Sequence, residues 1–318
     1  MQSVDVIIPV YRPDEGFLDL IEQLKRQDHA VHKIIIANTE KRYWDDLINC
    51  HASLRDMENL EVHHLEKKDF DHGATRRWAV KFSEAEYFLM MTQDAIPADD
   101  HLVENLLKPF ADPQVAVSYA RQLPKKGATT PVEDITRAFN YPSESRRKSK
   151  ADIENLGIKT YFCSNVCAMY RRDVYQKLGG FVKEAIFNED MYYAAAAVNA
   201  GYEIAYEASA KVYHSHVYSN QKQFQRNFDL GVSQADHPEI FEKVPSESEG
   251  VKLVKRTALG LLKRGRGLLI IPMLVTSAYK YFGYKAGKNY QNLTKKQIMK
   301  YTMNPTFWER RWESLSQK

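Results

Sequence analysis

Short apolar runs alternate with amphipathic segments through the first third of the chain, and this alternation constrains the fold more than any other feature. Residues 17–26 carry apolar side chains at helical spacing, and residues 73–83 follow a tight turn with a second helical pattern. Strands that alternate with helices favour a parallel sheet with crossover helices. Four runs have the length and composition of buried strands: 4–10, 33–37, 60–65 and 87–92.

The pattern changes after residue 94. Residues 124–160 are polar and charged without a clean period, and we expect a mobile substrate loop there. An alanine-rich helix is predicted over 189–200. Further short strands are predicted at 115–120, 162–170, 204–206 and 211–213.

Three cysteines, Cys50, Cys163 and Cys167, are too few and too unevenly spaced for a disulfide framework or a complete zinc site. We interpret Cys163 and Cys167 as small core residues. The apolar residues 4–10 lack the basic leader and cleavage site of a signal peptide. We therefore expect a cytoplasmic protein.

The basic residues are concentrated near the end of the chain. Residues 251–300 contain twelve Lys and Arg and no Asp or Glu, although the whole chain has a net charge of only +4. The uncharged run 267–279 has 13 residues and includes Pro272, so it is shorter than the roughly 20 residues of a membrane-spanning helix. We expect an interfacial helix on an anionic membrane, with packing of its apolar face on the protein body as the alternative. The sequence thus predicts a catalytic domain over 1–235 and a basic amphipathic helical region over 236–318.

Polar residues follow the predicted strands, where ligands of open α/β sheets bind. No G-x-G-x-x-G or G-x-x-x-x-G-K motif is present, so phosphates would be held by a metal ion or by arginine. Asp94 suits Mg²⁺ or Mn²⁺, although an Asp at a strand end is also common in turns. Asp71 and Arg76 begin the second helix and suit an anion, or they form a capped helix with a surface arginine.

Two further clusters lie late in the chain. Glu189 and Asp190 open the alanine-rich helix, where they serve either as simple capping residues or as a general base. His214 and His216 lie two residues apart on a strand-like segment and point the same way, as a metal or phosphate site requires.

These motifs, in this order, resemble the family-2 inverting glycosyltransferases of GT-A fold over residues 3–220. The segments that carry the resemblance are VDVIIPVYRP, the QDA after the fourth strand and the NED at the helix start. Within the family, the segments most similar to bacterial rhamnosyltransferases of surface-polysaccharide synthesis are FDHGATR, MTQDAIPAD, GGF…NED and YHSHVYS followed by RNFDLG. The implied fold is a Rossmann-like, mostly parallel sheet flanked by helices, with the basic helical extension at its C-terminal end.

The resemblance also implies roles for individual residues. Asp190 matches the catalytic base, with Glu189 beside it, and Asp94 matches the metal-binding aspartate. His214 or His216 matches a histidine near the metal and diphosphate. The nucleotide-sugar contacts implied are Pro9, Tyr11, Asn38, Asp71, Arg76 and Gln93.

This sequence departs from the family pattern in two places. The acidic residue usual after the second strand is Asn38, and the usual D-x-D is Gln93-Asp94-Ala95, which leaves one carboxylate. A histidine could complete the metal site.

The resemblance implies dTDP-β-L-rhamnose as donor and a glycan on a polyprenyl diphosphate as acceptor, used at the inner face of the cell membrane. Three alternatives are a UDP-hexose donor, an inactive membrane-bound assembly factor and a nucleic-acid-binding tail. The tail lacks a recognisable nucleic-acid module, so we expect no nucleic acid partner. The oligomeric state is open, a homo-oligomer included.

Overall fold

The structure, a computed structural model, describes residues 2–125, 129–216, 218–244 and 247–316. By contacts, the chain forms two compact units. The first comprises residues 1–123, 141–184 and 189–214, and the second comprises 124–140, 185–188 and 215–318. The sequence-based division into a catalytic domain over 1–235 and a basic helical region over 236–318 stays a prediction.

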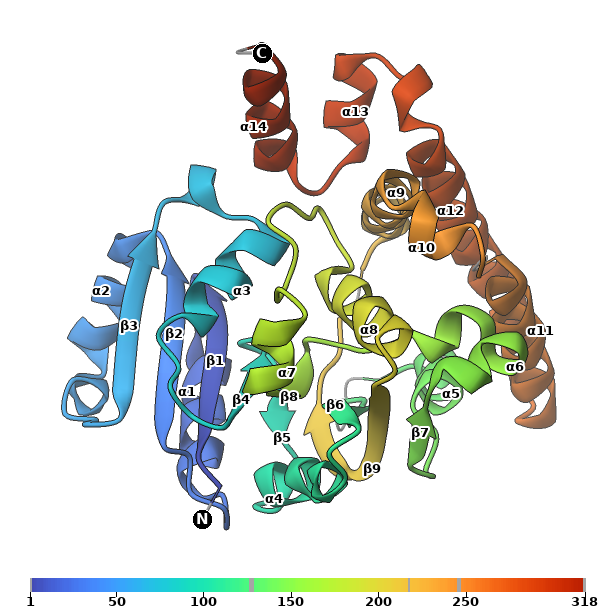
Figure 1. Cartoon of the computed structure of the whole chain (residues 1–318). Coiled ribbons are helices and arrows are strands. Elements are labelled where there is room, and N and C mark those ends of the chain that lie inside the picture. Colours follow the sequence, from blue (N-terminus) through green and yellow to red (C-terminus); the bar gives the residue numbers. More distant parts are fainter. Residues whose placement is uncertain (1, 126–128, 217, 245–246, 317–318) are drawn as a thin grey trace. The chain divides into compact units, whose positions relative to one another are not determined.

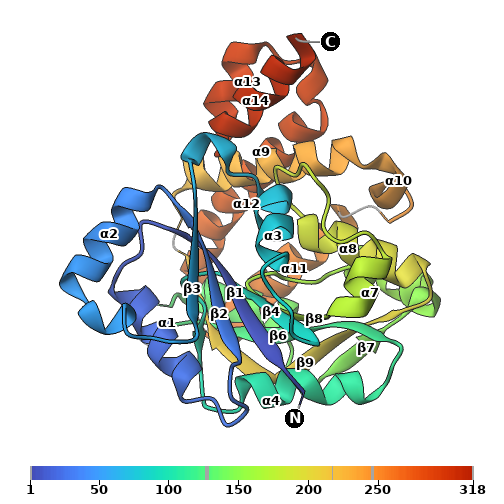
Figure 2. The ribbon, with the colours of Figure 1, turned by 60° about the vertical axis from the view of Figure 1, so that its left-hand side comes forward.

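The first unit begins with the predicted strand–helix alternation (Figure 1 and Figure 2). Val4, Val6, Ile8 and Val10 alternate along β1 (Val4–Tyr11) and pack with Phe17 of α1 (Glu15–Lys25) in one core. The four strands pair in parallel and are β1 (Val4–Tyr11), β2 (Lys33–Thr39), β3 (Leu60–Leu65) and β4 (Tyr87–Met91). The helices between them are α1 (Glu15–Lys25), α2 (Lys41–Cys50) and α3 (His72–Val80).

The sheet continues with strands of both directions in the order β3-β2-β1-β4-β8-β6-β9-β5, and β7 pairs with β9. β8 is antiparallel to β4 and β6, whereas β6 and β9 are parallel to each other. These strands are β5 (Ile96–Pro97), β6 (Val115–Leu123), β7 (Arg146–Lys148), β8 (Cys167–Arg171) and β9 (Glu203–Tyr213). The helices of this half are α4 (Leu102–Leu107), α6 (Ile153–Leu156), α7 (Arg172–Lys177) and α8 (Glu189–Asn199).

These directions bring several chain segments to one edge of the sheet, which we call the functional edge. It is formed by the carboxyl ends of β1, β2, β4, β6 and β9 and by the amino end of β8. The backbone N–H of Thr92 donates to the carbonyl of Val166 at 3.2 Å, which joins the end of β4 to the start of β8. The predicted α/β architecture, a mostly parallel sheet flanked by helices, is confirmed.

The expected irregular loop over 124–160 is wrong for much of its length, since it contains α5 (Pro131–Asn140), β7, α6 and short 3₁₀ turns. Buried Lys148 organises residues 141–160. Its ammonium donates to the Tyr119 hydroxyl at 3.2 Å and to the Lys159 carbonyl at 3.1 Å, and burial lowers the pKa of Lys148 to about 7. This segment is held by hydrogen bonds from a buried amine to several acceptors. Such bonds leave no periodic apolar pattern in the sequence from which the segment's structure could be predicted. Residues 126–128 lie outside the described residues.

Two other expectations need correction. The strand predicted at 162–170 covers only Cys167–Arg171, because the backbone N–H of Asn165 bonds to a side chain instead of a strand. The strands predicted at 204–206 and 211–213 are one strand, β9, with an irregularity where Glu207 pairs with Ala120 and Lys211 pairs with Arg121. Cys163 and Cys167 are buried, as predicted.

The second unit is helical. Its core includes Phe228, Val232, Phe307 and Trp308, and α5 packs with α11 (Glu247–Lys263) around Ile135. No helix among the described residues is long and apolar enough to cross a membrane. The helices besides α5 are α9 (Asn220–Asp236), α10 (Pro238–Phe241), α11 (Glu247–Lys263), α12 (Ile270–Lys288), α13 (Lys295–Tyr301) and α14 (Pro305–Ser316).

Glycines let α9 and α12 approach closely. A Cβ atom added to Gly287 would lie 2.1 Å from the Phe228 carbonyl oxygen, and one added to Gly283 would lie 2.2 Å from that of Phe224. A Cβ on Gly231 would lie 2.3 Å from the Tyr284 carbonyl oxygen. Backbone contact at these distances requires residues without side chains.

The motif RNFDLG lies on α9 and has a structural role in this unit. Asp229 is buried and accepts hydrogen bonds from the Thr302 hydroxyl at 2.6 Å, the Met303 N–H at 2.9 Å and the Asn304 amide at 2.9 Å. Burial raises the pKa of Asp229 to about 7 although these bonds oppose the shift. Asp229 therefore ties α9 to the turn before α14.

Candidate active site

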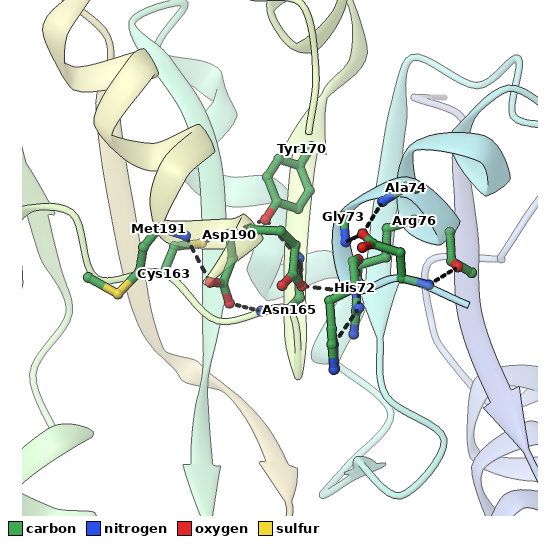
Figure 3. Close-up of polar contacts among 12 residues, drawn as sticks. His72, Gly73, Ala74, Arg76, Cys163, Asn165, Tyr170, Asp190 and Met191 are labelled. Carbon is green, nitrogen blue, oxygen red and sulfur yellow. Dashed lines mark hydrogen bonds and ion pairs between the residues drawn. The ribbon is translucent and has the colours of Figure 1, made fainter. Parts of the chain in front are cut away.

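Asp190 lies at the start of α8, where backbone donors hold its carboxylate. Oδ2 accepts from the Asn165 N–H at 2.9 Å and Oδ1 from the Met191 N–H at 2.8 Å (Figure 3). Burial and the neighbouring charge of Glu189 raise the pKa of Asp190 to about 7. A carboxylate with this pKa can accept a proton near neutral pH, which is the requirement for a general base.

Glu189 is buried beside Asp190 and is ion-paired. Its Oε1 lies 3.2 Å from Nε of Arg76 and accepts from the Asn165 side-chain amide at 2.9 Å. Burial alone would raise the pKa of Glu189, but the charges of Arg76 and His72 and the Asn165 hydrogen bond together lower it. Glu189 is thus held as a carboxylate, and its charge favours a protonated Asp190.

Asn165 connects the two carboxylates, and sequence reasoning did not identify it. Its backbone holds Asp190, its amide group donates to Glu189, and its carbonyl accepts from the Tyr170 hydroxyl at 2.7 Å (Figure 3). The available signal was a polar pair, Ser164-Asn165, directly before a buried run. The strand expected over 162–170 includes both residues.

Asp94 and His214 lie together at the functional edge. Oδ2 of Asp94 is 3.5 Å from Nε2 of His214, and the imidazole is buried. Nδ1 of His214 lies 3.0 Å from Oε1 of Gln122, whose amide group donates to the hydroxyls of Ser164 at 3.0 Å and Tyr141 at 2.5 Å. With the Gln122 amide in this orientation, Nδ1 carries the proton, and Nε2 is the basic nitrogen that faces Asp94.

The Asp94–His214 pair fits a divalent cation. Ligand bonds of about 2.1 Å at right angles place two ligand atoms about 3 Å apart, and wider ligand angles increase that separation. The observed 3.5 Å falls in this range. His216 follows two residues later in the segment assigned to the second unit, and its ring stacks on Tyr218 with centroids 5.2 Å apart. Its role as a ligand stays a prediction.

Tyr11 and Gln93 join the ends of β1 and β4. The Tyr11 N–H donates to Oε1 of Gln93 at 2.7 Å, and Nε2 of Gln93 donates to the Tyr11 carbonyl at 3.2 Å. The Tyr11 ring packs edge-on against Tyr43 at 5.5 Å, and the Arg12 guanidinium lies 4.9 Å from the Tyr43 ring centroid. These aromatic and cationic groups suit a nucleotide base and its phosphates.

Three other predicted nucleotide contacts lie at or near this edge. Pro9 is partly exposed within β1. The Asn38 side chain is buried, and Nδ2 lies 3.0 Å from Nδ1 of His64, while Oδ1 has no hydrogen-bond partner among the described residues. Asp71 caps α3 through Oδ1, which accepts from the N–H groups of Gly73 and Ala74. The structure brings these residues to one sheet edge, and their contacts with a donor stay predictions.

Comparison with known proteins identifies the class of enzyme. Residues 5–179 match the family model described as glycosyl transferase family 2. The chain belongs to this family and is a glycosyltransferase.

Two relatives are similar over nearly the whole chain. The O-antigen chain rhamnosyltransferase RfbN of Salmonella typhimurium is 39% identical over 308 residues, which are 96% of this chain and 96% of that protein. The O-antigen chain rhamnosyltransferase WbaN of Salmonella anatum is 37% identical over 311 residues, 97% of this chain and 96% of that one.

Solved structures of low identity share the fold. The mannosyltransferase PcManGT from Pyrobaculum calidifontis, in complex with GDP-Man and Mn²⁺, has a TM-score of 0.59 and 14% identity, covering 90% of this chain and 86% of that one. Residues 1–349 of TarS from S. aureus have a TM-score of 0.51 and 15% identity, covering 91% of each chain. The predicted GT-A fold is confirmed.

Proposed function

We propose that the protein transfers L-rhamnose from dTDP-β-L-rhamnose to a polyprenyl-diphosphate-linked saccharide during synthesis of a bacterial surface polysaccharide. Full-length similarity to two O-antigen chain rhamnosyltransferases supports the sugar and the acceptor class. The observation that carries the reaction type is the environment of Asp190, a half-buried residue whose carboxyl pKa is raised to about 7 by burial and by the charge of Glu189.

In the proposed reaction, Asp190 accepts the proton of an acceptor hydroxyl as that oxygen bonds to the anomeric carbon. The bond from this carbon to the diphosphate oxygen breaks at the same time, so the configuration inverts from β to α. The N–H groups of Asn165 and Met191 aim the carboxylate, and Glu189 keeps it basic. Positioning of this kind contributes through orientation of the reacting groups.

Asp94 and His214 would hold the divalent cation, Mg²⁺ or Mn²⁺, with His216 as a proposed third ligand. When bound, such a cation stabilises the negative charge of the leaving nucleoside diphosphate. Gln122 orients His214 so that Nε2 is available. The Mn²⁺ described for PcManGT supports the metal class.

Pro9, Tyr11, Asn38, Asp71 and Gln93 are the proposed contacts of the donor nucleotide. For Arg76, the predicted contact with the donor diphosphate competes with its ion pair to Glu189. We therefore propose that Arg76 acts mainly as a positioning residue that holds Glu189 ionised. The proposed location is the cytoplasmic face of the cell membrane, where the lipid-linked acceptor would be reached.

A donor panel tests the proposal. The purified protein is given dTDP-L-rhamnose, UDP-glucose or UDP-galactose with Mn²⁺ and a lipid-linked acceptor, and products are identified by mass spectrometry. We expect a mass increase of one deoxyhexose with dTDP-L-rhamnose alone. Addition of a hexose from UDP-sugars would overturn the donor but keep the mechanism. Nucleotide binding without turnover on any acceptor would favour an assembly factor.

A further inference from the structure

Exposed apolar side chains are concentrated in one stretch of the second unit. They lie on α11, on the 3₁₀ turn Gly267–Leu269 and on α12. Leu268 is 90% exposed and Ile271 is 71% exposed, values uncommon for large aliphatic residues. We call the following residues the apolar strip: Leu259, Leu262, Leu268, Ile271, Leu274, Val275, Tyr279 and Phe282.

The strip occupies one side of α12. Ile271, Val275, Tyr279 and Phe282 recur at intervals of three or four residues, so they share one face of the helix. The other face is already packed, since Gly283 and Gly287 contact the α9 backbone and the Thr276 hydroxyl donates to Asn220 at 2.7 Å. Packing on the protein therefore accounts for one face of α12 and leaves the strip exposed.

Cations accompany the strip. Lys255, Lys263 and Arg266 are exposed on α11 and in the turn after it, and residues 251–300 contain no acidic side chain. Gly265, with φ of +66°, allows this sharp turn between α11 and α12. The turn thus presents Leu268 and Ile271 with positive charges close by in the sequence.

The charge decides which occupant suits the strip. A second copy would bring two strongly basic surfaces together, which opposes self-association. An anionic bilayer accepts both parts, because its acyl chains bury the apolar residues and its headgroups attract the cations. We infer that the apolar strip inserts into the headgroup–acyl boundary of an anionic membrane, with Leu268 and Ile271 deepest. The inference rests on the proposed function in one respect: membrane contact would bring the enzyme to its lipid-linked acceptor.

Vesicle flotation tests the inference without requiring donor or acceptor, so its failure is distinct from failure of the proposed function. The full-length protein is mixed with vesicles of phosphatidylcholine alone or of an equal mixture with phosphatidylglycerol. We expect binding to the mixed vesicles. Leu268→Glu combined with Ile271→Glu should weaken binding at least about tenfold, because two buried aliphatic side chains are lost.

A matched control and a charge variant separate the two contributions. Leu315→Glu changes an equally apolar side chain, 62% exposed on α14, and should leave binding unchanged. Lys255→Gln, Lys263→Gln and Arg266→Gln together should weaken binding to mixed vesicles roughly a hundredfold, from about fivefold for each cation. Far-UV circular dichroism and thermal melting verify that each variant folds.

A depth probe provides the decisive readout. Leu268→Trp should show a blue-shifted emission on mixed vesicles and quenching by lipids brominated in the acyl chain, whereas Leu315→Trp should show neither. Unquenched Leu268→Trp, or wild-type binding by the double glutamate variant, would overturn the inference. A dimer that dissociates on Leu268→Glu in sedimentation velocity, without vesicle binding, would instead assign the strip to self-association.

Discussion

Nε of Arg76 lies 3.2 Å from Oε1 of Glu189, and both side chains are buried. This pair joins α3, which begins after the Asp71 cap, to α8, whose first two residues are Glu189 and Asp190. Burying one charge alone is costly, so the carboxylate of Glu189 and the guanidinium of Arg76 depend on each other. The pair keeps a fixed negative charge next to the proposed base.

The pH dependence of turnover should follow the ionisation of Asp190. Its pKa is raised to about 7, and only the carboxylate accepts a proton. We therefore expect kcat/KM to fall about tenfold per pH unit below this value and to level off above it. The profile is measured with a saturating metal ion, using a donor whose own ionisation lies outside the range.

Glu189→Gln should move the acid limb of that profile to lower pH. The Glu189 charge raises the pKa of Asp190, so its removal lowers that pKa, and Arg76 left without its partner adds to the shift. The variant should also be less stable by about 3–5 kcal/mol, because it leaves a buried charge unpaired. An unchanged acid limb in a folded variant would contradict the coupling.

Asn165 should behave as a positioning residue. Asn165→Ala keeps the backbone N–H that holds Asp190 but removes the amide that binds Glu189 and the acceptor for Tyr170. We expect kcat to fall about tenfold to a hundredfold, with a small change in KM. The pH profile distinguishes this role from a general loss of stability, since loss of the bond to Glu189 should also displace the acid limb. Tyr170→Phe should have a weaker effect of the same kind.

Gln122 should control metal affinity through His214. Gln122→Ala removes the acceptor that fixes the His214 tautomer, and the metal concentration for half-maximal effect should rise about 10- to 100-fold. Mn²⁺ binding, followed by electron paramagnetic resonance, provides a readout besides activity. His101→Ala is the control, because His101 forms a second, exposed group of possible ligands with Asp28 and Glu104, and its loss should leave Mn²⁺ binding at Asp94 and His214 unchanged. Equal Mn²⁺ affinity of Gln122→Ala and wild type would exclude this role.

The α9–α12 contact should tolerate no side chain at Gly287. A Cβ atom there would lie 2.1 Å from a backbone oxygen, so Gly287→Ala should cost about 1–3 kcal/mol or more of unfolding free energy. Gly250→Ala in α11 meets nothing within 4 Å and should be neutral or stabilising by up to about 1 kcal/mol. Urea unfolding compares the two variants. Equal stability would show that the helices separate at little cost.

Local patterns predicted the sheet well. The strands up to Met91 and the helices between them follow from apolar periodicity, and the parallel order follows from their alternation. Asp94 and His214 could be selected because each follows a strand that ends at the functional edge. The tertiary structure places these two side chains 3.5 Å apart, and their role as metal ligands stays a prediction.

Features that depend on distant polar contacts were not predictable. The three acceptors that surround buried Lys148 lie 29, 11 and 14 residues away from it in the sequence. No periodic pattern marks such a site. Asn165 leaves the strand because Asp190, 25 residues later, accepts its N–H. Arg76 was predicted at a phosphate, whereas its partner in the fold is Glu189. Sequence reasoning assigned each charge to a ligand and could not foresee that two of them pair.

The most direct measurement is the rate of rhamnose transfer by Asp190→Asn, with Asp173→Asn on α7 as the control. Asparagine keeps the shape and the bond to the Asn165 N–H but cannot accept the proton. We predict that Asp190→Asn binds dTDP-L-rhamnose normally and loses transfer by about a factor of a thousand, while the control is fully active. Transfer by a folded Asp190→Asn at more than about a tenth of the wild-type rate would contradict the assignment of Asp190 as the base.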